Sequence, residues 1–373
     1  EIVFGDWSSD VCSSDLDTLE QTYALMAARL GHLVPDLELS LKAELVLKIE
    51  RLKRARGALI LGHNYLEPAL FHPVADLTGD SLELCRQAAA TQCDPIVFCG
   101  VRFMAETAKV LNPDRTVLIP SERAGCSLAA SITGADVRAL KARFPGVPVV
   151  SYINTSAEVK AESDIICTSS NAARVVDSLG PGPVMFLPDE YLARNVARET
   201  GRHIIFPVKG AAAAGTANLD YQMIGWEGRC EVHEKFTVED IERVRAQFPD
   251  ALVLAHPECS PAVVEASDFS GSTSAMIRFV RERRPRRYLL LTECSMADNV
   301  AAETPGLEPV RMCSVRCPHM NEITLEQTLM ALELNRFEVT LPAAVMDRAR
   351  AALERMLAIG PAPDLVPSRK TIS

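Results

Sequence analysis

The sequence has few aromatic residues and lacks any long apolar run. Phe, Trp and Tyr make up 5% of the 373 residues, and Trp occurs only twice. Because no run of 18 apolar residues occurs, we expect neither a transmembrane helix nor a membrane partner. The net charge of −10 argues against a nucleic-acid-binding surface, although it says nothing about a local anion site. With 48% hydrophobic and 24% charged residues, the composition is that of an ordinary globular protein.

Cysteine is too scarce for a disulfide scaffold. The sequence contains 11 cysteines, an odd number, and shows no signal peptide, so we predict a cytoplasmic protein. Residues 1–16 have neither strand nor helix periodicity, and the stretch DWSSDVCSSDL resembles the translation of a sequencing adapter fused in frame. We therefore exclude these residues, with Cys12, from the predicted fold.

An internal repeat becomes visible when the chain is shifted against itself by 104 residues. At this offset residues 133–145 align with residues 237–249, and LARNVARET (192–200) aligns with MADNVAAET (296–304). A weaker copy precedes both and has its elements in the same order. Repeats of this length usually indicate repeated domains.

In each copy, short apolar runs alternate with helical stretches, which is typical of parallel sheets covered by helices. We predict an α/β fold with three three-layer α/β/α domains, related by a pseudo-threefold axis, with short parallel sheets and the active site at their common junction. The predicted units are an N-terminal helix at 17–37, repeats at 38–128, 129–232 and 233–322, and C-terminal helices with a tail at 323–373.

The expected strands are the apolar runs at 58–61, 95–99, 116–119, 148–152, 164–167, 184–187, 203–206, 251–255, 288–292 and 309–312. Thr133 and Thr237 are each followed by Asp three residues later, which predicts capping boxes. Ser40 is expected to cap the helix that contains Leu45 and Ile49.

Polar triplets follow the first expected strand of each copy: His63-Asn64-Tyr65, Tyr152-Ile153-Asn154 and His256-Pro257-Glu258. Ligands bind beyond the carboxyl ends of parallel strands, so three equivalent triplets predict one substrate pocket. The alternative, that each triplet merely ends a strand, does not account for the equivalent positions. The hydroxyls at Ser81, Ser169 and Thr273 follow the next strand, where they could receive carboxylate or phosphate or serve only as helix caps.

Cys126, Cys230 and Cys317 occupy the same place in the three copies. Three soft thiolates without a fourth partner favour an iron–sulfur cluster with one open iron. The competing interpretation is a zinc site completed by His233 or His319, although the spacings match no compact zinc module. Cys313 is either a spectator or a reversible disulfide partner of Cys317.

A dozen motifs occur in order and extend the evidence beyond single residues: GHNYLEP, GDSLEL, FMAETAKVLNP, AGCSLA, SYINTSAEVKAESD, CTSSNA, LPDEYLARNVA, GRCEVHEKFT, HPECSP, GSTSAM, TECSMADN and CPHMNEITLE. Together they resemble the quinolinate synthase family, the iron–sulfur enzymes of de novo NAD biosynthesis. The resemblance implies condensation of iminoaspartate with dihydroxyacetone phosphate, with loss of phosphate and water.

The same resemblance implies roles for individual residues. A 4Fe-4S cluster would be held by Cys126, Cys230 and Cys317. Catalysis would involve Tyr65, His256 and Glu258, with Tyr65 and Glu258 transferring protons. The implied substrate contacts are His63, Ser81, Tyr152, Asn154, Ser169, His256, Glu258 and Thr273. Some family members carry C-x2-C-x2-C at the last ligand, where this chain has Cys313-x3-Cys317, so a redox switch built on that triplet is not expected to carry over.

Two other functions compete. One is the diphosphate-reducing enzyme of isoprenoid synthesis, another triplicated iron–sulfur enzyme, whose signature motifs are not apparent here. The other is an electron carrier or structural metal protein, in which four ligands would usually seal the cluster. Three ligands beside a polar pocket favour catalysis. The pathway further indicates functional coupling to L-aspartate oxidase, which makes the unstable imine.

Overall fold

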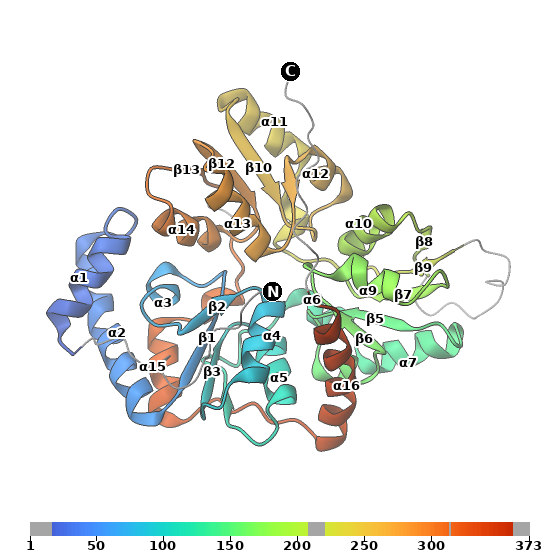
Figure 1. Cartoon of the computed structure of the whole chain (residues 1–373), viewed down its shortest axis with the longest axis horizontal. Coiled ribbons are helices and arrows are strands. Elements are labelled where there is room, and N and C mark those ends of the chain that lie inside the picture. Colours follow the sequence, from blue (N-terminus) through green and yellow to red (C-terminus); the bar gives the residue numbers. More distant parts are fainter. Residues whose placement is uncertain (1–16, 208–220, 313–314, 361–373) are drawn as a thin grey trace.

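The structure is a computed structural model, and it describes residues 17–207, 221–312 and 315–360. The predicted adapter-derived segment at 1–16 lies outside these residues. Three parallel sheets, each flanked by helices, form three lobes around a common centre (Figure 1). The predicted α/β class with three-layer units and short parallel sheets is confirmed, whereas the exact unit boundaries stay a prediction.

The three sheets share one topology. Their orders are β2-β1-β3-β4, β6-β5-β7-β9-β8 and β11-β10-β12-β13, and every pairing between these strands is parallel. The second sheet differs by the added edge strand β8. The strands are β1 (Leu59–His63), β2 (Leu77–Gly79), β3 (Ile96–Cys99), β4 (Val117–Leu118), β5 (Val149–Tyr152), β6 (Ile165–Cys167), β7 (Val184–Leu187), β8 (Ile204–Ile205), β9 (Met223–Ile224), β10 (Ala251–Ala255), β11 (Phe269–Ser270), β12 (Arg287–Leu291) and β13 (Glu308–Val310).

Helices separate consecutive strands in each lobe, as parallel connections require, except between β8 and β9, where residues 208–220 lie outside the described ranges. They are α1 (Leu19–Leu30), α2 (Asp36–Arg56), α3 (Pro68–Phe71), α4 (Ser81–Ala90), α5 (Arg102–Leu111), α6 (Ser127–Ala130), α7 (Gly134–Arg143), α8 (Ala157–Ala161), α9 (Ala172–Ser178), α10 (Glu190–Thr200), α11 (Val238–Gln247), α12 (Pro261–Ala266), α13 (Thr273–Arg283), α14 (Cys294–Glu303), α15 (Leu325–Leu334) and α16 (Ala343–Ile359), with short 3₁₀ helices η2 (His233–Lys235) and η3 (Met320–Glu322). Among the described residues, no helix combines the length and the apolar composition needed to cross a bilayer.

The repeat is retained in the structure. Helices α7 and α11 begin after Thr133 and Thr237, and both threonines form the predicted capping boxes with Asp136 and Asp240. The prediction for Ser40 is wrong. Helix α2 already begins at Asp36, after Pro35, and the Ser40 hydroxyl donates a hydrogen bond to the Asp36 carbonyl inside the helix. Acidic residues in the first turn complement the helix dipole and allow this earlier start.

Three short strands, β2, β9 and β11, were not among the expected apolar runs. Each has only two or three residues. β4 and β8 are as short but lie in three consecutive apolar residues, VLI and IIF, whereas β2, β9 and β11 have at most two, so no apolar run marks them in the sequence. Their positions nevertheless complete the shared topology, because β2 and β11 occupy equivalent sheet edges and β9 occupies the position of β4 and β13.

Helix α16 connects two of the lobes. It packs against α8 and β6 of the second lobe and against α5 of the first, and in Figure 1 it lies between them. The Arg350 guanidinium donates to the Val110 carbonyl in the first lobe, and the Arg355 guanidinium donates to the Asp164 carbonyl in the second. The buried residues of α16 include Leu353.

The buried strands beneath the site should dominate stability. Leu61 in β1 is 0% exposed, whereas Leu37 in α2 is 74% exposed. Leu61→Ala is expected to lower the free energy of unfolding by about 2–5 kcal/mol, because it removes buried methyl groups and leaves a cavity. Leu37→Ala makes the same chemical change at the surface and should alter it by less than about 0.5 kcal/mol. Chemical denaturation measures both, and equal losses would contradict the burial of β1.

Candidate active site

A cavity of about 690 Å3, including its open mouth, lies where the carboxyl ends of the three sheets meet. All three lobes contribute to its wall. Parallel sheets place their ligand sites at this edge, because the loops after the strands converge there. Every residue that the sequence analysis predicted as a site residue lies on this wall: His63, Tyr65, Ser81, Cys126, Tyr152, Asn154, Ser169, Cys230, His256, Glu258, Thr273 and Cys317.

The hydroxyls of Ser81 and Thr273 are not used as helix caps. Asp80 is the N-cap of α4, where its carboxylate accepts from the backbone N–H groups of Leu82 and Glu83. Ser272 likewise caps α13, so Ser81 and Thr273 are the first helical residues. The capping interpretation therefore does not apply to these two residues, and their hydroxyls lie at the N-terminal ends of helices that line the cavity.

His63 and His256 are held in the same tautomer by equivalent contacts. The backbone N–H of Tyr65 donates to His63 Nδ1, and the backbone N–H of Glu258 donates to His256 Nδ1, both at 3.3 Å. Since Nδ1 accepts, the proton of each neutral ring lies on Nε2. Burial lowers the pKa of His63 to about 4 and the pKa of His256 to about 3. Both rings are therefore neutral hydrogen-bond donors at neutral pH.

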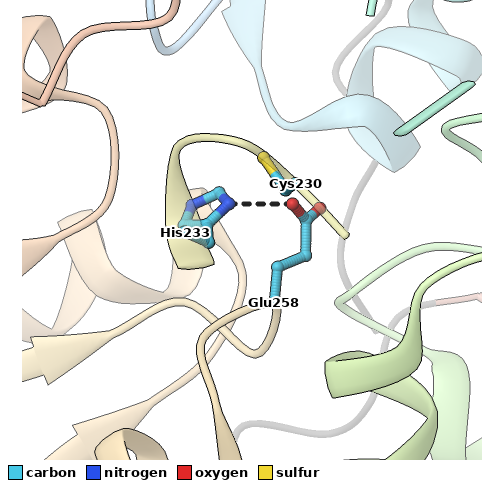
Figure 2. Close-up of side chains that lie close together, drawn as sticks. All are labelled: Cys230, His233 and Glu258. Atoms are coloured by element: carbon cyan, nitrogen blue, oxygen red, sulfur yellow. Dashed lines mark hydrogen bonds and ion pairs between the residues drawn. The ribbon is translucent and has the colours of Figure 1, made fainter. Parts of the chain in front are cut away.

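Glu258 is the most heavily hydrogen-bonded carboxylate of the cavity. Its Oε1 accepts from the Tyr152 hydroxyl at 2.5 Å and from Asn154 Nδ2 at 3.3 Å. Its Oε2 lies 2.8 Å from His233 Nδ1, as Figure 2 shows. Burial alone would raise the pKa of Glu258, but the contact with His233 and the other donors lowers it below the ordinary value. The group is therefore held as a carboxylate.

A continuous chain of contacts connects Glu258 to Tyr65. His233 Nε2 lies 2.9 Å from Thr292 Oγ1, and the Tyr65 hydroxyl lies 2.5 Å from the same Thr292 oxygen. Burial raises the pKa of Tyr65 well above its ordinary value, so the phenol keeps its proton. Figure 2 shows His233 extending from the segment that carries Cys230 toward the Glu258 carboxylate.

Sequence reasoning considered His233 only as a zinc ligand, and it did not identify Thr292. The signal for His233 was its fixed place in GRCEVHEKFT, three residues after Cys230. Thr292 gave no repeat signal, because Pro188 occupies its place at the offset of 104 residues. Both residues belong to the site because together they link Glu258 to Tyr65, two of the predicted site residues.

The three cavity cysteines share one backbone environment. Each precedes a short helical turn: α6 after Cys126, η2 after Cys230 and η3 after Cys317. Burial raises the pKa of all three thiols, to about 12 for Cys126 and about 11 for Cys317, while the backbone N–H groups of the second and third residues after each cysteine act in the opposite direction. At Cys167, burial is the only influence on the pKa. Each cavity cysteine thus has two backbone N–H groups that can donate hydrogen bonds to a thiolate sulfur.

A family model described as "Quinolinate synthetase A protein" matches residues 47–358. The chain belongs to the quinolinate synthase family. It is 52% identical over 344 residues to "Quinolinate synthase 2" of Mesorhizobium japonicum, covering 92% of this chain and 100% of the relative. It is 53% identical over 331 residues to "Quinolinate synthase" of Agrobacterium fabrum, covering 89% of this chain and 90% of the relative.

The cavity of this family member brings three thiols together with a set of polar side chains. The donor set fits an iron–sulfur cluster, because three soft sulfur ligands line one space and each has backbone N–H groups directed at it. Cys313, which the sequence analysis considered as a redox partner of Cys317, lies outside the described residues.

Cys230, His233 and Glu258 also have ligand atoms within 4.8 Å of one another (Figure 2). A thiol, an imidazole and a carboxylate are common metal ligands, but this composition is the only respect in which the group resembles a cation site. Both ring nitrogens of His233 already contact Glu258 and Thr292, and the ring of His319 contacts Glu231 at 3.1 Å. His233 therefore has no ring nitrogen left for zinc, whereas the contact of His319 uses Nε2 alone and does not decide between the three-cysteine set and a Cys3His site.

Proposed function

We propose that this protein is a cytoplasmic quinolinate synthase that condenses iminoaspartate with dihydroxyacetone phosphate, releasing phosphate and water. The product enters de novo NAD biosynthesis. The observation that carries the proposal is the convergence of the three cysteines and the polar strand-end triplets on one cavity. Family membership over residues 47–358 supports the same reaction.

We infer that Cys126, Cys230 and Cys317 hold a 4Fe-4S cluster. When bound, the cluster supplies a Lewis acid at the iron that has no protein ligand. The protein contributes the thiolates and the backbone donors that stabilise them. Hydrogen bonds to ligand sulfur are one means by which a protein tunes such a group.

Substrate anions would be held by hydrogen-bond donors. Among the described residues, the cavity wall contains no lysine or arginine. The Nε2–H groups of His63 and His256 and the hydroxyls of Ser81, Ser169 and Thr273 supply donors instead. The carboxamide oxygen of Asn154 is buried and, within the described residues, has no hydrogen-bond partner, so it is available to a substrate N–H or O–H.

Tyr65 and Glu258 divide the proton transfers between them. Forming the pyridine ring requires removal of protons from carbon and protonation of departing hydroxyl groups. Glu258 is held as a carboxylate, the form that can accept a proton, and Tyr65 as a phenol, the form that can donate one. Each pKa lies away from neutrality, which weakens Glu258 as a base and Tyr65 as an acid. His256 stacks on His233 with a centroid distance of 4.6 Å, and from its place on the cavity wall its Nε2–H would donate to the reacting molecule.

The imine substrate is unstable in water, so the oxidase that produces it must supply it shortly before this enzyme uses it. Functional coupling to L-aspartate oxidase follows from that instability. The structure describes a single chain, and the coupling needs only rapid transfer of the imine.

The reaction itself provides the direct test. The full chain, purified and reconstituted with iron and sulfide under anaerobic conditions, is given dihydroxyacetone phosphate and freshly generated iminoaspartate. Quinolinate formation with about four irons per chain is expected. Absence of quinolinate from a cluster-loaded protein would refute the proposed reaction while leaving the metal site intact, and the diphosphate reductase reaction would then be assayed.

A further inference from the structure

The central residue of each strand-end loop is held from both sides by one buried nitrogen. After β1, β5 and β10, the loops present Tyr65, Asn154 and Glu258 to the cavity. In every case the carbonyl of the preceding residue and the carbonyl of the following residue accept hydrogen bonds from the same side-chain nitrogen. We call this arrangement a carbonyl clamp, and the three nitrogens belong to Asn299, Lys160 and Asn195.

The clamp around Glu258 comes from the second lobe. Asn195 in α10 donates from Nδ2 to the Pro257 carbonyl at 2.8 Å and to the Cys259 carbonyl at 3.0 Å. The residue is 7% exposed. Two facing carbonyl oxygens identify the inner amide atom as nitrogen. The peptide group that precedes Glu258 and the one that follows Cys259 are therefore both tied to a neighbouring helix.

The clamp around Tyr65 has the same construction. Asn299 in α14 donates from Nδ2 to the Asn64 carbonyl at 3.2 Å and to the Leu66 carbonyl at 2.8 Å. It is 1% exposed. Asn195 and Asn299 are equivalent at the repeat offset of 104 residues. One helix position thus performs the same task twice, each time across a boundary between lobes.

The third clamp has a different origin. Thr107 occupies the position of Asn195 in the first copy, and its hydroxyl donates to Phe103 within its own helix. Lys160 in α8, which is 0% exposed, instead donates to the Ile153 carbonyl at 2.9 Å and to the Thr155 carbonyl. The hydrogen-bonding pattern is retained although the residue type and the donating helix have changed.

The position of these clamps relative to the chemistry distinguishes them from ordinary buried amides. Fixing the peptide group before the loop residue and the one after its successor restricts the backbone dihedral angles between them, and with them the direction of the loop residue's Cα–Cβ bond. Small errors in the position of a catalytic group are costly, since a displacement of about 1 Å can reduce the rate about 100-fold. The carbonyl clamps hold the loop backbone beside Tyr65, Asn154 and Glu258, where a shift would displace these side chains.

We propose that Asn195, Asn299 and Lys160 are positioning residues that set Glu258, Tyr65 and Asn154 in their places around the cavity. The proposal rests on the proposed function for its kinetic consequences, but the clamp geometry is independent of the reaction. None of the three side chains is among the residues that line the cavity, so each acts through the loop residue that it clamps.

The test compares Asn195→Ala and Asn299→Ala with Asn112→Ala. Asn112 is a matched control, because its buried Nδ2 also donates to two carbonyls, those of Ala88 and Ala108, neither of which flanks a predicted site residue. The two clamp variants are expected to lose about 10- to 100-fold in kcat/KM, with unchanged iron per chain. Asn112→Ala should keep kcat/KM within about twofold even where its melting temperature falls equally. Clamp variants that behave like this control would overturn the proposal.

A double-mutant cycle separates positioning from a general structural effect. If Asn195 acts through Glu258, Asn195→Ala should reduce the kcat/KM of Glu258→Gln by less than about threefold. The same substitution on the Tyr65→Phe background should retain its full effect. Fully multiplicative losses in both backgrounds would contradict action through Glu258. Should Asn195→Ala fail to fold, the isosteric Asn195→Asp variant, which cannot offer both donors, replaces it.

A crystal structure of Asn195→Ala gives a measurement that needs no activity. The 257–259 loop is expected to shift relative to the unsubstituted protein, while the rest of β10 stays in place. An unmoved Glu258 would refute the clamp. If the unsubstituted protein makes no quinolinate, the proposed function fails and this structural comparison alone decides the further inference.

Discussion

The Cys230→Ala variant is expected to lose both its iron and its quinolinate-forming activity. The thiol lies on the cavity wall with Cys126 and Cys317, and without it the proposed cluster would keep only two of its three cysteine ligands. Activity should fall by at least about 100-fold, since the Lewis acid is lost with the cluster. Iron and sulfide per chain, measured after anaerobic reconstitution, are compared with the rate in the same sample.

Cys85→Ala is the matched control for this experiment. Cys85 is buried in α4, where burial raises the pKa of its thiol to about 12, and it does not line the cavity. This variant should keep both iron and activity. Cys126→Ala and Cys317→Ala should behave like Cys230→Ala. An active Cys230→Ala protein with a full complement of iron would refute the three-cysteine ligand set.

Glu258→Gln is expected to reduce kcat by about 100- to 10,000-fold, the usual range for a lost general base. The amide has nearly the same shape as the carboxylate but cannot accept a proton. It also places an N–H group where Tyr152 and His233 make their contacts with the carboxylate oxygens. Anaerobic steady-state kinetics give kcat and KM, and iron per chain should be unchanged.

The control for Glu258→Gln is Glu162→Gln, a change of the same chemistry at a residue that pairs with Arg138 away from the cavity. Its kcat should stay within about twofold of the unsubstituted protein. A Glu258→Gln variant that also retained kcat would remove Glu258 from the proton transfers. An unchanged kcat with a raised KM would instead assign it to substrate binding alone.

The sequence alone was sufficient to predict that the candidate site residues lie together around one cavity. Tyr65, Asn154 and Glu258 occupy equivalent places in the copies, and parallel strands direct equivalent loops to the same edge of each sheet. The motifs of the quinolinate synthase family added the reaction, which no spacing could supply. The individual roles of these residues stay predictions that the variants above test.

Other parts of the site depend on contacts between distant segments. His233 and Thr292 join Glu258 to Tyr65 only after the first and third lobes have come together, and no local pattern encodes that contact. The edge strand β11 was missed because its one apolar residue, Phe269, stands between Asp268 and Ser270 and forms no apolar run. Ser40 was mistaken for a cap because serine favours that position, whereas Pro35 and Asp36 determine where α2 begins.

Helix α16 has a consequence for synthesis of the chain. It covers α8 and β6, and Ala349, Ala352, Leu353 and Met356 supply its buried face. The second lobe is therefore translated long before the helix that covers it. Until residue 356 has left the ribosome, the apolar surface of a nearly finished lobe remains open to water and to other nascent chains. Ribosome-bound chains of this length would be natural clients for chaperones that shield apolar surface.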